Sequence, residues 1–204
     1  VIENQEYYYQ AVLDSIQQEM SDQVVIYLYK QDEAVELIGT DGGGHSIPKF
    51  NTYYYTFISE RPDFTDKYGI HNPPVGAHEL VHVLTHLTLG YPGTKLMSEG
   101  YANWLDGSYA YHSIKELLSY YKNNDPEKVL SPDQLLNEST DVEAVYYPNC
   151  GVFIGYLVDK YGIVKINKLF TTSRDDFKSK FAQITGDDWT TMSQRYMQYL
   201  SNFY

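Results

Sequence analysis

Apolar residues recur with two different spacings in the first third of the chain. Over residues 4–20 they return at every fourth position, which predicts an amphipathic helix. β-Branched and aromatic residues dominate residues 24–30 and 50–59, which is typical of strands, and a short apolar run at residues 35–38 could pair with the first of these. The pattern therefore predicts an opening helix followed by a small sheet.

From residue 75 onward the apolar spacing is helical. Residues 75–89 predict one helix, with Pro74 near its first turn and Gly90 as its end. Residues 99–105 predict a second helix, which Ser98 would cap. The other expected elements are a polar loop over residues 131–141 and helices over residues 113–124, 151–161, 164–170, 174–185 and 188–203. Strands followed by helices predict an α+β fold.

Composition narrows the classes of protein that fit. Hydrophobic residues make up 43% and charged residues 21% of the 204 residues, which indicates a globular protein. The net charge of -12 argues against binding to nucleic acid or to an anionic membrane. The one cysteine, Cys150, excludes an internal disulfide, and no apolar run is long enough for a transmembrane segment. Val1 is not a methionine, so either a signal sequence has been removed or the chain is a trimmed piece; with signal removal we expect a secreted or cell-envelope location.

The stretch GAHELVHVLTH, residues 76–86, carries the first candidate chemistry. Residues four apart on a helix lie about 40° apart around its axis and about 6 Å along it, so His78 and His82 face the same way. Two imidazoles at that spacing can converge on one tetrahedral metal ion, while Glu79 stays close without binding it. His86 lies too far along the helix to share the ion. This HExxH pattern predicts a zinc site with a carboxylate beside it.

A catalytic zinc site needs a third protein ligand and an open position for water. The extended pattern HExxHxxGxxH would supply a third histidine, but this chain has Thr85 and Thr88 in place of its glycine and final histidine. Glu99, at the head of the next helix, is the better candidate, because the turn at residues 90–93 folds one helix back on the other. Asp106, on the same face, could accept the second N–H of a ligating histidine or be a solvated acid at the helix end.

Three stretches of the chain resemble the gluzincin metallopeptidases, the thermolysin-like superfamily, in the short bacterial form described as peptidase MA-like. They are HELVH at residues 78–82, SEGYANWLD at residues 98–106 and YYPNCGVFIGYLVDKYG at residues 146–162. The resemblance implies a zincin-like fold and one Zn²⁺ ion bound by His78, His82 and Glu99.

The same resemblance assigns the catalytic groups. Glu79 would be the general base and acid, and Tyr147, with Tyr146 as the alternative, would donate a hydrogen bond to the oxyanion. The chain lacks the GxMEN-type strand with which the aminopeptidase branch binds a free N-terminus, so we expect an endopeptidase. If residues 52–58 form an edge strand, they could pair with an extended peptide substrate.

Together these features predict one zincin-like metallopeptidase domain over residues 1–204. A sheet-rich part, residues 1–74, would pack its small mixed sheet on the HExxH helix; residues 75–107 would carry the zinc helices, and residues 108–204 would be helical. The expected function is zinc-dependent hydrolysis of a peptide or protein substrate. Two other functions stay open: a non-catalytic module that binds peptides or proteins with the same fold, and a metal-dependent hydrolase of a non-peptide bond.

Overall fold

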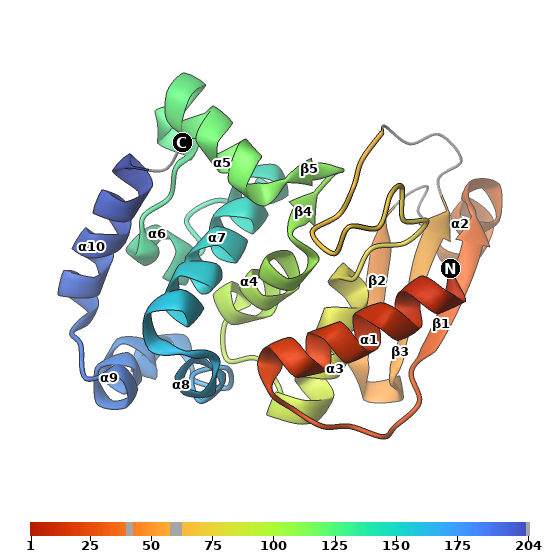
Figure 1. Cartoon of the computed structure of the whole chain (residues 1–204), viewed down its shortest axis with the longest axis horizontal. Helices are drawn as coiled ribbons and strands as arrows, with labels where there is room; N and C mark the ends of the chain where they lie inside the picture. The colour runs from red at the N-terminus through yellow and green to blue at the C-terminus, as the bar shows by residue number, and fades with distance from the viewer. Residues whose placement is uncertain (40–42, 58–62, 203–204) are drawn as a thin grey trace.

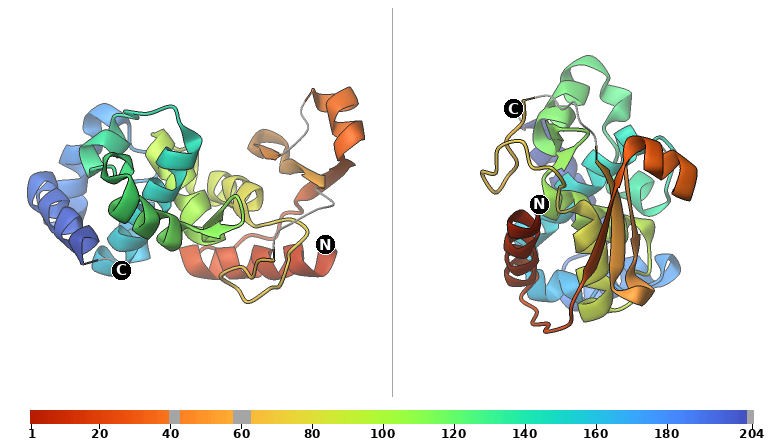
Figure 2. Two further views of the ribbon diagram at one scale, coloured as in Figure 1. Left: turned by 90° about the horizontal axis from the view of Figure 1, so that it is seen from above. Right: turned by 90° about the vertical axis from the view of Figure 1, so that its right-hand side faces the viewer.

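The computed structural model describes residues 1–39, 43–57 and 63–202, and its elements confirm an α+β fold. Figure 1 shows a small sheet at one end of the molecule and a group of helices at the other, and the left view of Figure 2 shows the same division from above. The two parts correspond to successive segments of the sequence: the three strands of the sheet come before residue 58, and helices dominate afterwards.

The N-terminal part combines a three-stranded sheet with two helices. Its elements are α1 (Ile2–Ile16), β1 (Val25–Lys30), α2 (Gln31–Ile38), β2 (Gly44–Ile47), a 3-10 turn (Pro48–Phe50) and β3 (Thr52–Phe57). The strand order is β1-β3-β2, with β1 parallel and β2 antiparallel to β3. The expected opening helix, the two expected strands and the small mixed sheet are therefore confirmed. Residues 58 and 59 of the second expected strand lie outside the described residues.

Residues 35–38 do not form the predicted strand, because they complete helix α2. The helix begins with a capping box in which the Lys30 N–H donates to the Glu33 carboxylate at 3.1 Å, and it ends at Gly39 in the left-handed conformation. Ala34 is fully buried, so this face of α2 packs toward the interior of the protein. The third strand is instead β2, whose sequence GHSI lacks the apolar alternation that predicts a strand.

The next two helices are α3 (His78–Leu89) and α4 (Lys95–Asp106). Helix α3 begins three residues later than predicted, so Pro74 precedes it, and it ends before Gly90 as predicted. Helix α4 begins earlier than predicted, because Thr94 and not Ser98 caps it: Thr94 Oγ1 accepts the Met97 N–H at 3.2 Å. Ser98 therefore lies inside the helix, where its side chain is available for another contact.

The C-terminal part is helical apart from one hairpin. Its elements are β4 (Ser108–Tyr109), β5 (His112–Ser113), α5 (Ile114–Asn124), a 3-10 turn (Pro126–Lys128), α6 (Pro132–Leu136), α7 (Glu143–Tyr161), α8 (Ile163–Asn167), α9 (Arg174–Thr185) and α10 (Trp189–Ser201). The hairpin was not predicted, and α6 occupies the expected loop because Ser131 and Gln134 form a capping box there. Helix α7 begins well before residue 151, so both candidate tyrosines lie on it. Residue 203 of the last expected helix lies outside the described residues.

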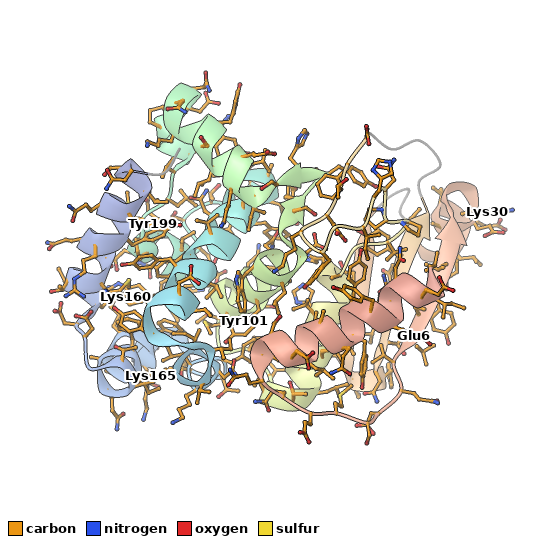
Figure 3. The ribbon with its side chains drawn as sticks, in the orientation of Figure 1. Glu6, Lys30, Tyr101, Lys160, Lys165 and Tyr199 are labelled. Carbon is orange, nitrogen blue, oxygen red and sulfur yellow. The ribbon has the colours of Figure 1, made fainter. Side chains whose placement is uncertain are left out.

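Helix α4 is held tightly against the helical part of the molecule. It packs on α7 so closely that a Cβ on Gly151 would lie 2.8 Å from Asn103 Cβ. Tyr101 of α4 is fully buried and donates to Asn167 of α8 at 2.8 Å, and Figure 3 shows it among the central helices. Asn167 in turn donates to the Ile16 carbonyl of α1 at 2.8 Å. These contacts fix α4 from two sides.

No helix in the described part of the chain is long and apolar enough to cross a membrane.

Candidate functional site

His78, His82 and Glu99 lie together where α3 packs on α4. The Nε2 atoms of the two histidines are 3.2 Å apart, and Glu99 Oε2 is 3.5 Å from His78 Nε2 and 3.6 Å from His82 Nε2. In a tetrahedral zinc site with metal–ligand bonds of about 2.0–2.1 Å, ligand atoms are separated by roughly 3.3 Å. The three atoms are therefore spaced as ligands of one ion, and these residues could hold a metal, as the sequence predicted.

The surroundings of the Glu99 carboxylate indicate whether a cation fits this site. Its Oε2 atom is buried and has no hydrogen-bond partner among the described residues. The two imidazole nitrogens that face it lie beyond the usual hydrogen-bond length of about 2.7–3.2 Å. A buried carboxylate oxygen without a partner is unfavourable, and a cation between the three groups would remove that cost. The residues present therefore fit a bound metal ion, and two nitrogens with one oxygen form a donor set that suits zinc.

Charge in the metal-free site is shared between His78 and Glu99. Burial disfavours protonated His78, but the Glu99 carboxylate, together with Glu79 and Asp106, outweighs burial and raises the pKa of His78 to about 9. Burial also disfavours the Glu99 carboxylate, yet His78 and His82 lower its pKa to about 2. A proton therefore occupies the metal-free site at neutral pH.

We expect zinc binding to release about one proton per ion near pH ~7.5. His78 is protonated at this pH, because its pKa is about 9, and an imidazole must be neutral to bind a metal. The apparent zinc affinity should rise with pH and level off above the pKa of His78. Calorimetric titration of metal-free protein in two buffers of different ionisation enthalpy counts the protons. A release of only about a tenth of a proton per histidine, as for an ordinary pKa of about 6.5, would contradict the raised pKa.

Ser98 supports His82 from the side opposite to the metal ligands. Its Oγ is 3.3 Å from Nδ1 of His82, the ring nitrogen that does not face Glu99. A partner at this nitrogen orients a ligating imidazole. Sequence reasoning missed the contact, because a serine early in a helix is suited equally to capping the helix and to facing a neighbouring one.

Asp106 lies at the end of α4 and is buried, so it is not a solvated acid. Its carboxylate accepts the Ala77 N–H at 2.7 Å and the Ser108 hydroxyl at 2.6 Å. Asp106 thereby ties the residue before His78 to the first residue of the β4–β5 hairpin. A hydrogen bond from a ligating histidine to Asp106 stays a prediction.

The three residues His78, His82 and Glu99, here called the metal-binding triad because they could hold one ion, open into a cavity of about 800 Å³. Its walls come from β2, α3, α4, the β4–β5 hairpin and α7, and many of its side chains are aromatic. These are Tyr55, Phe64, Tyr91, Tyr109, Tyr111, Tyr147 and Phe170. The edge of the sheet at this cavity is β2, whereas β3 is the central strand. The predicted pairing of a substrate with residues 52–58 is therefore wrong for the described residues, because β1 and β2 already flank β3 on both sides.

Glu79 follows His78 on α3 and lines the same cavity. Only 9% of it is exposed. Gly44, the first residue of β2, packs directly on this side chain: a Cβ at position 44 would lie 2.5 Å from Glu79 Cγ and 2.7 Å from Tyr55 Cδ2. The absence of a side chain at Gly44 therefore leaves the space in which Glu79 lies.

Tyr147, and not Tyr146, lines the cavity beside the triad. The rings of Tyr147 and His78 are stacked, with centroids 6.0 Å apart and an interplanar angle of 18°. The Tyr147 hydroxyl donates to Glu143 at 3.4 Å, and burial raises its pKa above the usual range, so it stays protonated at neutral pH. Tyr146 is fully buried and donates to the Leu135 carbonyl at 2.8 Å. Of the two predicted candidates, only Tyr147 is placed to meet a ligand.

His86, the third histidine of the motif stretch, lies outside the triad. It lines the cavity, and its ring packs edge-on against Tyr91 with centroids 5.4 Å apart. The group of residues that could hold a metal does not include it in the described part of the chain. The exclusion of His86 by its distance along the helix is therefore consistent with the fold.

The sequence matches no family model, and a search of curated proteins found no match. The functional conclusion therefore depends on the geometry of this site and on the residues that form it.

Proposed function

We propose that this protein is a zinc-dependent hydrolase that cleaves peptide bonds as an endopeptidase. The observation that carries the proposal is the buried Glu99 Oε2, which accepts no hydrogen bond among the described residues and faces His78 Nε2 at 3.5 Å and His82 Nε2 at 3.6 Å. Three protein ligands would leave a fourth position for water, which is typical of catalytic zinc and not of structural zinc. The buried Glu79 on the wall of the same cavity supports a catalytic role over a structural one, because a structural ion needs no base.

The chemistry follows from the groups around the triad. A zinc ion bound there would lower the pKa of a water molecule and polarise a peptide carbonyl. Glu79 would accept the proton of that water and pass it to the leaving amine. Tyr147 keeps its proton at neutral pH, so its hydroxyl can donate a hydrogen bond to the oxyanion.

The edge of β2 supports an extended peptide as the substrate. β2 pairs with β3 along one side, and its residues Gly44, His45 and Ser46 line the cavity. A peptide can add to such an edge through main-chain hydrogen bonds, which are independent of its side chains. The aromatic side chains of the cavity would then contact the side chains of the peptide.

Replacing Gly44 with alanine should lower kcat roughly tenfold or more while zinc stays bound, because even a small displacement of a catalytic group is costly. The added Cβ would lie 2.5 Å from Glu79 Cγ, so the carboxylate must move. Steady-state kinetics and zinc content measure the two effects. Ser46→Ala, on the same strand, is the matched control, since it removes an atom and adds none. Equal kcat for the wild type and Gly44→Ala would show that the position of Glu79 is not critical.

Replacing Tyr147 with phenylalanine should lower kcat by roughly one to two orders of magnitude with little change in zinc affinity, because one oxyanion donor is lost. Tyr109→Phe is a suitable comparison, since its ring packs on Tyr147 at a centroid distance of 5.9 Å and lines the same cavity. A larger loss for Tyr109→Phe than for Tyr147→Phe would assign the donor to Tyr109 instead.

Metal analysis and peptide-library cleavage of the same protein preparation test the proposed function. One zinc per chain, with cuts inside peptides whose two ends are blocked, would support an endopeptidase. Cuts confined to free peptide ends would indicate an exopeptidase. Bound zinc without cleavage across a broad library would favour a binding module, and protein with no affinity for zinc would overturn the proposal.

A further inference from the structure

A second cavity, of about 510 Å³, adjoins the metal-binding triad at the turn between α3 and α4. We call it the Lys95 pocket; its walls are residues 91–95 and 98–99 with Glu138 and residues 173–175. Tyr91, Pro92, Ser98 and Glu99 line both this pocket and the larger cavity, so the two share a wall beside the triad. An extended ligand bound at the triad would pass next to the pocket.

Lys95 is the cation of this pocket that has no acidic partner. Its Nζ lies over the ring of Tyr146 at 5.2 Å and over that of Tyr147 at 5.5 Å, and no ion pair with a carboxylate is found for it among the described residues. Arg174, the other cation of the pocket, is paired with Glu138. A cation on the wall of a cavity beside the triad can bind an anionic group of a ligand through a charged hydrogen bond.

The separation of Lys95 and Glu99 along α4 indicates how many peptide residues would lie between the cleaved bond and a carboxylate bound by Lys95. Lys95 precedes Glu99 by four residues on α4, so the two side chains share a face and are about 6 Å apart along the axis. An extended peptide advances about 3.3 Å per residue. A carboxylate held by Lys95 would therefore belong to a residue one or two positions from the bond at the triad.

Three acidic side chains line the pocket around Lys95, and two of them already face cationic groups. Lys95 is the first residue of α4, where the positive end of the helix dipole adds to its charge. Of the acidic residues that line the pocket, Glu138 is neutralised by Arg174, and Glu99 faces the two histidines. Asp175, in the first turn of α9, is the remaining acid.

We propose that the Lys95 pocket is a carboxylate-binding subsite that selects peptides with an acidic side chain, or the C-terminal carboxylate, one or two residues from the cleaved bond. The inference rests on the proposed peptide substrate and deepens it. It makes Lys95 a specificity-determining residue, because an uncharged side chain at the same peptide position would leave the ammonium group unpaired.

Binding of peptide pools to the zinc-loaded Glu79→Gln protein tests the subsite without requiring turnover. Three pools of octapeptides, random except at one position and at the C-terminus, would be captured on the immobilised protein and quantified by mass spectrometry. The first carries Glu and an amidated C-terminus, the second Gln and an amidated C-terminus, and the third Gln and a free carboxylate. We expect the first or the third pool to be retained roughly tenfold more than the second, as for a charged hydrogen bond. Which of the two is enriched identifies the source of the carboxylate.

Lys95→Met, added to the same protein, keeps the hydrocarbon stem over the tyrosine rings and removes the charge, so it should abolish the enrichment. Lys160→Met is the matched control, because Lys160 is exposed near the end of α7, in the helical half of the molecule (Figure 3). Circular dichroism verifies that each variant is folded. Equal retention of all three pools, retention of none, or enrichment that persists in Lys95→Met would overturn the subsite. Failure of the wild type to cleave any peptide would count against the proposed hydrolase alone, since capture does not depend on cleavage.

Discussion

Replacing Glu79 with glutamine should lower kcat for peptide cleavage by about 10³-fold while one zinc ion per chain stays bound. The amide cannot accept a proton from water, whereas His78, His82 and Glu99 are unchanged. Glutamine also has nearly the size of glutamate, so the close packing of Gly44 on this side chain is preserved. Steady-state kinetics on a cleaved library peptide and metal analysis of the same sample measure the two quantities.

The control for this variant is Glu116→Gln, which removes one negative charge from an exposed position on α5. It should leave both kcat and zinc content unchanged, and so separates the loss of a base from the loss of a charge. A Glu79→Gln protein that cleaves peptides at more than about a tenth of the wild-type rate would exclude Glu79 as the general base. Loss of zinc from this variant would show instead that Glu79 helps to bind the metal.

Replacing Glu99 with alanine should weaken zinc binding on the order of 10³-fold or more, because one of three protein ligands is lost from the site. The same change removes the carboxylate that raises the pKa of His78, while burial still lowers that pKa. Zinc binding to Glu99→Ala should therefore release far less than one proton at about pH 7.5. Competition with a chelator of known affinity measures the first effect, and calorimetry in two buffers measures the second.

Glu143→Gln is the matched control for the loss of Glu99. Glu143 also lines the cavity, and it accepts a hydrogen bond from Tyr147 at 3.4 Å, but it does not belong to the metal-binding triad. Its replacement should change zinc affinity much less than Glu99→Ala does. Equal losses in the two variants would mean that the negative charge of the cavity, and not ligation by Glu99, sets the affinity.

Much of the candidate site could be predicted because it depends on local geometry. The spacing of His78 and His82 places them on one face of any helix, and the turn after Gly90 returns the chain so that Glu99 can meet them. The same reasoning excluded His86, which indeed lies outside the triad. The assignment to the gluzincin peptidases, by contrast, stays a prediction, since no comparison with known proteins tests it.

The errors of the sequence analysis have a common cause in packing between distant segments. Residues 35–38 have the apolar content of a strand, but the capping box at Lys30 and Glu33 begins a helix before them. Strand β2 was missed, because the strand is short and polar and forms only through its pairing with β3. As a result, β3 was expected at the edge where the structure has β2.

Local spacing was thus sufficient for the two histidines, for the glutamate between them and for the class of fold, since each follows from the repeat of one helix or from the order of elements. The packing of the folded chain alone decided that Tyr147 and not Tyr146 meets the cavity, that Ser98 contacts His82, and that Lys95 forms no ion pair with an acid among the described residues. These contacts depend on which faces of α7, α4 and α3 pack against one another. The distances involved join residues far apart in sequence, so no short stretch of the chain contains them.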